Sequence, residues 1–313
     1  MSIFRSTYEK LAADNLVRSF FRDQRAEGEM PTPLADALAD AVRSKSKLYP
    51  LVNVQRMKGR SRVYTIFADV KPGWGRCCSN LNFEDAEYQV KATAEIEGYF
   101  LTVPAVLNGC YVEGSANQIE AFILALSGPM AESLDRAILY SDGEGGNAPK
   151  GIISQLAEDH IIALSDGSGS AHHGQVLYNA LAVAADLCGI PKYETDRLFG
   201  AVANRKTISA LLREIESKET RLPEYLPQLL AKVAISDVMP DGDVLFGYTK
   251  VYRLYERGNY KAGYSALGPG FIENKLSFKA QAVFDSSLVE PECFVLVNIN
   301  GMPPTTSMLN STI

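Results

Sequence analysis

The chain has 313 residues, of which 46% are apolar and 22% charged, a balance typical of a globular protein with a hydrophobic core. Its length fits two domains, or one large domain with extensions. The longest apolar run, residues 119–126, is too short to cross a bilayer, and the first five residues lack the apolar stretch of a signal peptide. Composition therefore argues against a membrane-spanning or secreted protein and predicts a cytosolic product.

The net charge of −6 is unevenly distributed. Residues 1–62 hold twelve Lys or Arg against seven Asp or Glu, an excess of five positive charges, so the remainder carries −11. A basic arm of this kind is as often a solvated surface as a binding segment. If it binds, its partner is acidic: either nucleic acid, contacted at the phosphates without sequence preference, or a negative face of a neighbouring subunit. Arg18, Arg22 and Arg25 are the candidate contact residues of this arm.

The cysteines show no disulfide or metal pattern, since their number is odd and the adjacent first pair lacks the C-x-x-C spacing of zinc and redox sites. Reduced thiols are therefore expected. The five positions are Cys77, Cys78, Cys110, Cys188 and Cys293.

Helical periodicity begins at residues 6–25 and resumes at residues 34–41, after a Gly- and Pro-marked break. The strongest helical signal covers residues 115–140, where seven large apolar side chains form one stripe. Gly128 and Pro129 interrupt this stripe. Because proline removes a backbone donor and clashes with the preceding turn, a kink or two abutting helices is expected there.

A long two-stranded ribbon is predicted between the second and third of these helices. Residues 63–70 are rich in β-branched and aromatic side chains, and residues 88–103 alternate between the two faces of a strand. The turn at residues 71–76 forms the exposed tip and contains Lys71, the chain's only tryptophan, Trp74, and Arg76. A large aromatic side chain at an exposed tip favours contact with another surface. It can also fold back onto its own subunit.

The second half of the chain alternates helix and strand signals. A helix ending at Gly189 follows a Gly/Ser loop, and Asn204 is a good N-cap between a short strand and another helix. The turn at residues 257–259 is hairpin-like. The last third is predicted to be β-structure, at residues 244–254, 260–264, 276–284 and 293–299.

Each motif that would indicate catalysis or metal binding lacks a required residue or spacing. The glycine-rich segment from Asp142 lacks the closing glutamate of a calcium loop, because the twelfth residue is Ile153, and Lys150 is not followed by Ser or Thr as a P-loop requires. Neighbouring His172 and His173 cannot easily share one metal. No cysteine is favoured as a nucleophile. The sequence therefore predicts no catalytic residue, metal site or cofactor.

Four segments, taken in order, resemble the major capsid proteins of tailed bacteriophages, which have the Hong-Kong-97-type fold. The first joins a long helix to a glycine-rich turn and a Pro-x-Gly-Ile sequence, and the second is a strand, an asparagine and a helix. The third has valine, then methionine-proline, then a strand ending in phenylalanine-glycine, and the fourth matches the closing strands. They lie at residues 134–152, 199–211, 233–248 and 276–295.

The resemblance implies an α+β subunit built from four parts. Residues 1–55 would form an N-terminal arm and residues 56–92 an extended β-ribbon loop. A peripheral domain with the long spine helix would hold residues 93–150 and 265–292. An axial domain would hold residues 151–264 and 293–313. An arm and a ribbon are wasteful in a monomer, and they are stabilised if neighbouring copies bury them.

The implied function is a capsid subunit that self-assembles, as hexamers and pentamers, into the icosahedral shell around phage DNA. Its expected partners are other copies, a separate scaffold protein, portal and decoration proteins, and DNA held by non-specific phosphate contacts, and no membrane is expected. It would be assembled in the host cytoplasm and reside in the virion capsid. The candidate interface residues are those of the ribbon tip and the basic arm. Two alternatives remain open at this point: an encapsulin-type shell that packages enzymes, and a soluble enzyme of unknown reaction.

Overall fold

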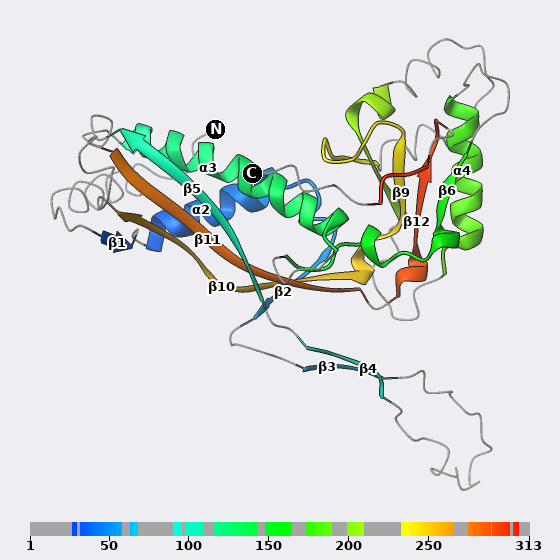
Figure 1. The fold of residues 1–313 in the computed structure, drawn as a ribbon, viewed down its shortest axis with the longest axis horizontal. Coiled ribbons are helices and arrows are strands. Elements are labelled where there is room, and N and C mark those ends of the chain that lie inside the picture. Colours follow the sequence, from blue (N-terminus) through cyan, green and yellow to red (C-terminus); the bar gives the residue numbers. More distant parts are fainter. Residues whose placement is uncertain are drawn as a thin grey trace, which may run out of the picture.

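The computed structural model describes residues 27–29, 32–57, 63–67, 90–95, 98–108, 116–142, 148–164, 173–189, 199–209, 233–265, 275–288, 290–300 and 303–306. Two five-stranded sheets and a separate two-stranded ribbon make up its β-structure (Figure 1). Helices accompany both sheets, so the chain belongs to the predicted α+β class.

The first sheet is built on two long antiparallel strands, β10 (Tyr252–Ser265) and β11 (Lys275–Leu288). Strand β5 (Tyr99–Asn108) pairs with the far side of β11, also antiparallel. The other side of β10 holds two short strands, antiparallel β1 (Glu27–Glu29) and parallel β2 (Asn53–Met57). The ten-residue strand β5 therefore lies at one edge of this sheet.

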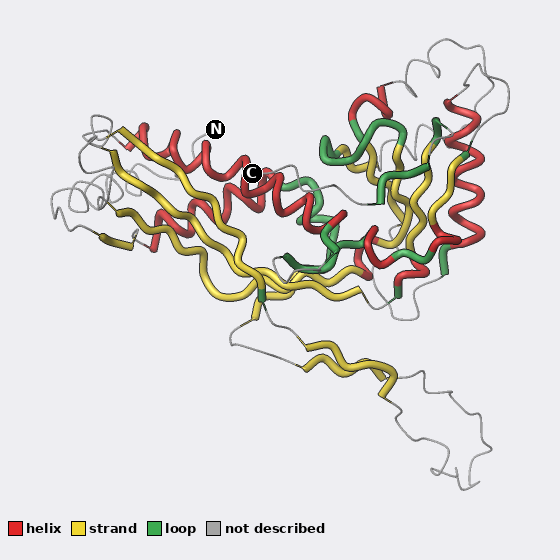
Figure 2. Tube along the Cα trace, viewed as in Figure 1, coloured by secondary structure: helices red, strands yellow, loops and turns green. Residues whose placement is uncertain are grey.

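Two helices, α2 (Thr32–Lys45) and α3 (Ala116–Tyr140), pack on each other and cover one face of the first sheet (Figure 2). Both follow the predicted helical periodicity. Their apolar stripes meet the inward-facing positions of the strands, so the core forms between the helices and the sheet. The most deeply buried helical side chains include Leu38, Val42, Met130, Leu134, Ile138 and Leu139.

The second sheet is mixed and has apolar cover on both faces. Helix α4 (His173–Leu187) packs on one face, while the other face continues the core of the first sheet. All five residues of the interior strand β12 are consequently buried, which explains the apolar run of its first four residues. The strand order is β6 (Ile161–Ala163), β12 (Phe294–Asn298), β9 (Asp243–Tyr248), β7 (Phe199–Ala203) and β8 (Val233–Ile235). The described residues also form four short 3₁₀ turns: η4 (Ile153–Gln155), η5 (Glu158–His160), η6 (Thr249–Val251) and η7 (Pro291–Cys293).

The Pro-x-Gly-Ile segment, residues 149–152, closes the C-terminal end of α3. Gly151 N–H donates to the Ser141 carbonyl at 2.6 Å, and Ile152 N–H donates to the Ile138 carbonyl at 2.8 Å. The last carbonyls of a helix have no partner within the helix, and the bond to Ile138 satisfies one of them. The Ser141 carbonyl, just after the helix, also accepts the Ser154 hydroxyl at 2.6 Å. The Lys150 carbonyl also joins the segment to the first sheet, accepting hydrogen bonds from the hydroxyls of Tyr252 and Ser286.

We expect Gly151→Ala to destabilise the subunit. An added Cβ would lie 2.7 Å from the carbonyl of Leu139 and 2.8 Å from the amide nitrogen of Ser141, and backbone atoms cannot swing aside as a side chain can. Overpacked sites of this kind cost about 1–3 kcal/mol. Denaturant unfolding measures the loss, with Gly200→Ala as the control, because its added Cβ meets nothing within 4 Å. Equal midpoints for the two variants would contradict the prediction.

The predicted N-cap at Asn204 is confirmed. Its Oδ1 accepts the Lys206 amide at 2.6 Å, the bond expected of a helix N-cap, and its Nδ2 donates to the Met239 carbonyl at 2.8 Å. A second hydrogen bond joins the same two segments: the Gly242 amide donates to Thr207 Oγ1. The asparagine and methionine-proline segments, about thirty-five residues apart in the chain, therefore form one joint at the end of the second sheet.

Two strand predictions are wrong. Residues 88–103 were expected to form one strand, but they are divided between the ribbon strand β4 (Val90–Glu95) and β5, with Gly98 at φ +92° beside the start of β5. The hairpin expected at residues 257–259 is a bulge within continuous β10. Gly258 takes a φ of +66°, and the register shifts between Arg257 and Lys261 without reversing the chain.

Helix α3 runs through Pro129 as a single element, so the alternative of two abutting helices is wrong. The ring of a proline normally clashes with the Cβ of the preceding residue, but that residue is Gly128, which has none. Pro129 itself is exposed, where the missing backbone bond is least costly. The predicted helix at residues 6–25 lies outside the described residues.

The sheets depart from the expected domain division at two points. Residues 252–264 were placed with the axial part, but they form most of β10 and pair with β11 in the first sheet. Within the expected arm 1–55, the segment 35–54 belongs to the main body, because α2 packs on α3 and its side chains enter the core. Long-range pairing and burial decide both points, and neither leaves a local sequence signal.

Candidate assembly surfaces

The six interface residues predicted from the sequence, Lys71, Trp74, Arg76, Arg18, Arg22 and Arg25, lie outside the described residues. The base of the predicted ribbon is described and is confirmed as a ribbon. Strand β3 (Val63–Phe67) pairs antiparallel with β4, Val63 opposite Glu95 and Phe67 opposite Val90. Figures 1 and 2 show this pair projecting away from both sheets.

The root of the ribbon is held on the first sheet at Gly98. Its amide donates to Asp285 Oδ2 at 3.2 Å. A Cβ at this position would lie 2.7 Å from Arg257 Nη1 and 3.0 Å from a methyl of Val283, so the backbone passes close over the sheet. Strands β10 and β11 therefore fix where the ribbon leaves the body.

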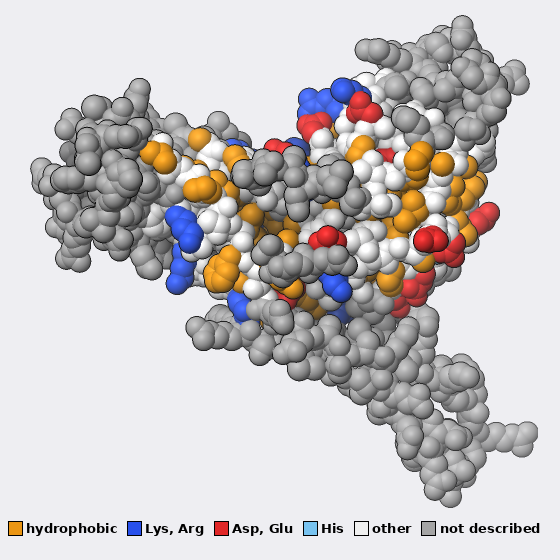
Figure 3. Space-filling view, in the orientation of Figure 1, with side chains coloured by type: hydrophobic (Ala, Val, Ile, Leu, Met, Phe, Trp, Pro, Cys, Tyr) orange, Lys and Arg blue, Asp and Glu red, His pale blue; other side chains and the backbone are white. Residues whose placement is uncertain are grey.

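The face of β5 that points away from the helices is unusually apolar. Exposure alternates along the strand: Phe100, Thr102, Pro104 and Val106 are exposed, and the residues between them pack toward α3. Phe100 and Val106 keep 66% and 62% of their surface exposed, the highest values for large hydrophobic side chains in the described part of the chain. We call these four residues the β5 stripe. In Figure 3, hydrophobic side chains and a few Lys or Arg share the surface over β5 and β11.

The backbone edge of β5 is protected from pairing with a further strand, although the side chains of the β5 stripe are exposed. Pro104 stands in the middle of the strand, opposite Lys279 of β11. Proline has no backbone N–H, and it is tolerated in sheets at edge strands, where it blocks pairing with another chain. A partner would therefore contact the stripe through side chains rather than by extending the sheet.

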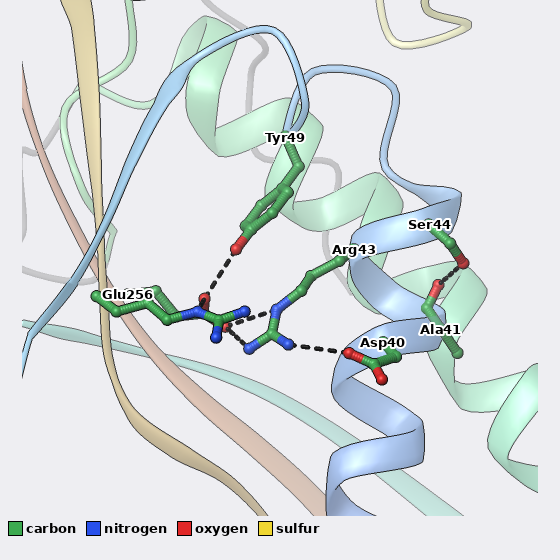
Figure 4. Close-up of polar contacts among 7 residues, drawn as sticks. Asp40, Ala41, Arg43, Ser44, Tyr49 and Glu256 are labelled. Atoms are coloured by element: carbon green, nitrogen blue, oxygen red, sulfur yellow. Dashed lines mark hydrogen bonds and ion pairs between the residues drawn. The ribbon is translucent and has the colours of Figure 1, made fainter.

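A buried carboxylate ties the segment before the ribbon to the first sheet (Figure 4). Glu256, in β10, has a 2% exposed side chain. Its Oε1 accepts bonds from Arg43 Nε at 3.2 Å and Nη2 at 2.7 Å, and its Oε2 accepts the Tyr49 hydroxyl at 2.8 Å. Arg56 adds a longer contact at 3.6 Å, and Asp40 pairs with Arg43 from the solvent side. These five residues form the Glu256 cluster.

Contact with Glu256 changes the pKa of two members of the cluster, Tyr49 and Arg43. Burial, followed by the bond to Glu256, raises the pKa of Tyr49 to about 12, so the hydroxyl remains a donor at neutral pH. The pKa of the Arg43 guanidinium is also raised, because its hydrogen bond and charge interaction with Glu256 outweigh the opposing effect of burial. The cluster holds Arg43 and Tyr49 against β10 of the first sheet.

A second buried carboxylate, Asp135 of α3, holds the loop that follows α2. It accepts hydrogen bonds from the Ser46 hydroxyl and from the amides of Lys47 and Leu48. Burial raises the pKa of Asp135, and these three donors oppose the rise. Together with the Glu256 cluster, Asp135 fixes the path of the chain from α2 to the ribbon.

The described residues contain no group of three or more His, Cys, Asp or Glu side chains that could hold a metal ion. Among the helices that the structure describes, none has the length and apolarity needed to cross a membrane. Sequence reasoning missed both Glu256 and the β5 stripe, because burial and sheet position decide both.

Comparison with known proteins is informative at the level of structure. No protein-family model and no curated sequence matches the chain. The capsid of an empty GTA particle matches with a TM-score of 0.59 at 18% identity, covering 82% of this chain and 90% of that one. A virus-like particle from Pyrococcus furiosus matches at 0.55 and 15% identity, covering 85% and 97%. The holo-SrpI encapsulin complex from Synechococcus elongatus matches at 0.54 and 10%, covering 86% and 92%.

The chain therefore has the fold of a shell protein. In particular it is the Hong-Kong-97-type fold expected from the four sequence segments, with a spine helix, two sheets and a projecting ribbon.

Proposed function

We propose that this protein is a shell subunit whose copies assemble into a closed icosahedral particle, as the major capsid protein of a tailed phage does around DNA. The observation that carries the proposal is the fold: capsid and virus-like particle subunits match 82–85% of the chain and 90–97% of their own length. The projecting ribbon and the open β5 stripe fit a subunit that is completed by its neighbours. Catalytic turnover is not part of this function.

An encapsulin-type shell is the second candidate, because the Synechococcus encapsulin matches the same fold at similar coverage. Two features favour a phage-type shell. The first 62 residues carry an excess of five positive charges, which suits packaged nucleic acid. A satellite phage P4 procapsid, whose structure includes a size-determination protein, also shares the fold at 90% coverage of this chain. We extend the proposal to a separate scaffold, portal and decoration partners, with assembly in the host cytoplasm.

The domain division carries over as a proposal, with its bounds adjusted to the observed strands. Residues 58–95 would form the ribbon, residues 35–57, 98–150 and 252–292 would contribute to the peripheral part, and residues 151–251 and 293–313 to the axial part. Hexamers and pentamers would then form by heterologous contacts between identical copies.

The experiment for the shell function is size-exclusion chromatography and negative-stain microscopy of the purified protein, followed by analysis of its contents. Rings, shells or other assemblies of many copies are expected. Nucleic acid inside them would support the phage reading, and a co-purified enzyme would support the encapsulin reading. A chain that stays monomeric at milligram-per-millilitre concentration, with or without nucleic acid, would contradict both.

Trp74→Ala is expected to block shell closure while the subunit stays folded. Buried tryptophan anchors at interfaces often cost at least about 2 kcal/mol when truncated, and a shell repeats each contact many times. Acidic partners for the neighbouring Lys71 and Arg76 come from the net −11 of residues 63–313. Circular dichroism and microscopy test the variant. Normal shells would refute docking of Trp74 on a neighbour, and an unfolded monomer would show that it packs on its own subunit.

A further inference from the structure

The C-terminal end of α4 and the turn η7 come into direct backbone contact. Gly189, immediately after Cys188, donates its amide hydrogen to the carbonyl of Glu292 at 2.9 Å. A Cβ on Gly189 would lie 3.1 Å from Cγ and 3.8 Å from Cβ of Glu292, so the two segments approach closely. The contact brings together residues about a hundred positions apart in the sequence.

This hydrogen bond brings Cys188 and Cys293 near each other, because Cys188 precedes the donor Gly189 and Cys293 follows the acceptor Glu292. Burial is the main cause that raises the pKa of Cys293, and the charge of Cys188 contributes to it, which places the two thiols within range of each other. Disulfides need Cα atoms about 4.4–6.8 Å apart. Both thiols are free in this structure, and they are 9% and 1% exposed.

From this geometry we propose that Cys188 and Cys293 are a latent disulfide site that closes within one subunit under oxidising conditions. Turn η7 lies between β11 of the first sheet and β12 of the second, so the bond would fasten α4 to the connection between the two sheets. The crosslink would close a loop of about a hundred residues, and long loops gain most from closure. Such a bond stiffens the subunit without adding a contact between subunits.

The reaction is thiol–disulfide exchange with a small disulfide such as oxidised glutathione. The sulfur of Cys188, the more exposed of the two, attacks one sulfur of oxidised glutathione and releases one reduced glutathione. The sulfur of Cys293 then displaces the second glutathione, forming the Cys188–Cys293 bond. The protein loses two hydrogens, and one oxidised glutathione becomes two reduced ones.

The surroundings of Cys188 and Cys293 keep both thiols reduced until the protein meets oxidising conditions. Burial raises the pKa of both thiols to about 12, and the charge of Glu290, which accepts the Cys293 thiol at 3.8 Å, adds to the rise at Cys293. Little of either group is therefore thiolate at neutral pH, and exchange is slow. The cytosol keeps thiols reduced, whereas a particle that leaves the cell meets oxidising surroundings. Oxidation after the particle leaves the cell rests on the proposed function, whereas formation of the disulfide itself does not.

The test refolds the full-length chain in a glutathione redox buffer, so that burial does not limit access, and maps its peptides without reduction. The expected product is a peptide pair linked through Cys188 and Cys293. The oxidised protein should melt about 5 °C or more above the reduced protein, an increase that Cys188→Ser and Cys293→Ser each abolish. The measurement is made on the unassembled subunit, so it does not depend on whether shells form.

Two outcomes would overturn the proposal. Glutathione attached separately at both positions, with no internal link, would show that the thiols cannot meet. A linked protein that melts at or below the temperature of the reduced form would show that the bond strains the fold instead of fastening it.

Discussion

Replacing Phe100 with aspartate is expected to abolish shell assembly while leaving the subunit folded. The side chain is 66% exposed on the outer face of β5, so its loss costs the isolated subunit little. If a neighbouring copy covers the β5 stripe, the same change buries an unpaired carboxylate at every repeat of the contact. Burying a charge without a partner is strongly unfavourable, and the cost is multiplied around the particle.

The variant is compared with wild type by microscopy for particles and by thermal melting for the subunit. Ala185→Asp, at an exposed position of α4, is the matched control and should leave assembly unchanged. Phe100→Tyr keeps the apolar ring and should assemble. Particles of normal yield from Phe100→Asp would show that the stripe is not a subunit contact, whatever surface the shell uses instead.

Glu256→Gln should destabilise the subunit by roughly 2–4 kcal/mol, because removing one member of a buried charge pair leaves the other charge uncompensated. This expected loss of stability is set lower than for a fully buried charge pair because the Arg43 side chain retains 21% exposure. Tyr49 and Arg43 both lose a charged acceptor, so the path of the chain into the ribbon should loosen as well.

Denaturant unfolding measures this loss, and proteolysis of residues near β2 reports the loosening. Asp241→Asn is the control, because its pair with Lys206 is exposed at both ends and exposed pairs contribute about 0–1 kcal/mol. If both substitutions cost the same, the Glu256 cluster would be no more than a surface ion pair.

Local structure could be predicted from the sequence wherever interactions between neighbouring residues determine it. Asn204 was identified as an N-cap because only a few residue types accept the first free amides of a helix. Periodicity located α2, α3 and α4, and alternation located the ribbon. The Pro-x-Gly-Ile segment was recognised as a motif, although its reason, the close approach of Gly151 to the end of α3, is visible only in three dimensions.

The sequence did not predict how the strands pair within the sheets, and the reason is physical. A glycine between two strand signals fits a hairpin as well as a bulge, and at Gly258 the pairing of β10 with β11 on both sides of the bulge decides between them. Pro129 shows the reverse case: a helix-breaking residue lies inside α3, where the missing Cβ of Gly128 removes one of the clashes that proline would cause.

By itself, the sequence determined the α+β class, helices α2, α3 and α4, the ribbon and, through four spaced segments, the shell-protein fold. Only the tertiary structure decided which strands share a sheet, that Glu256 is buried against Arg43 and Tyr49, and that Phe100 and Val106 stand exposed on an edge strand. Helix and turn propensities act between neighbours in the chain, and the sequence displays them directly. Burial and strand pairing join residues as much as about two hundred positions apart, as between Arg43 and Glu256, and no local pattern records them.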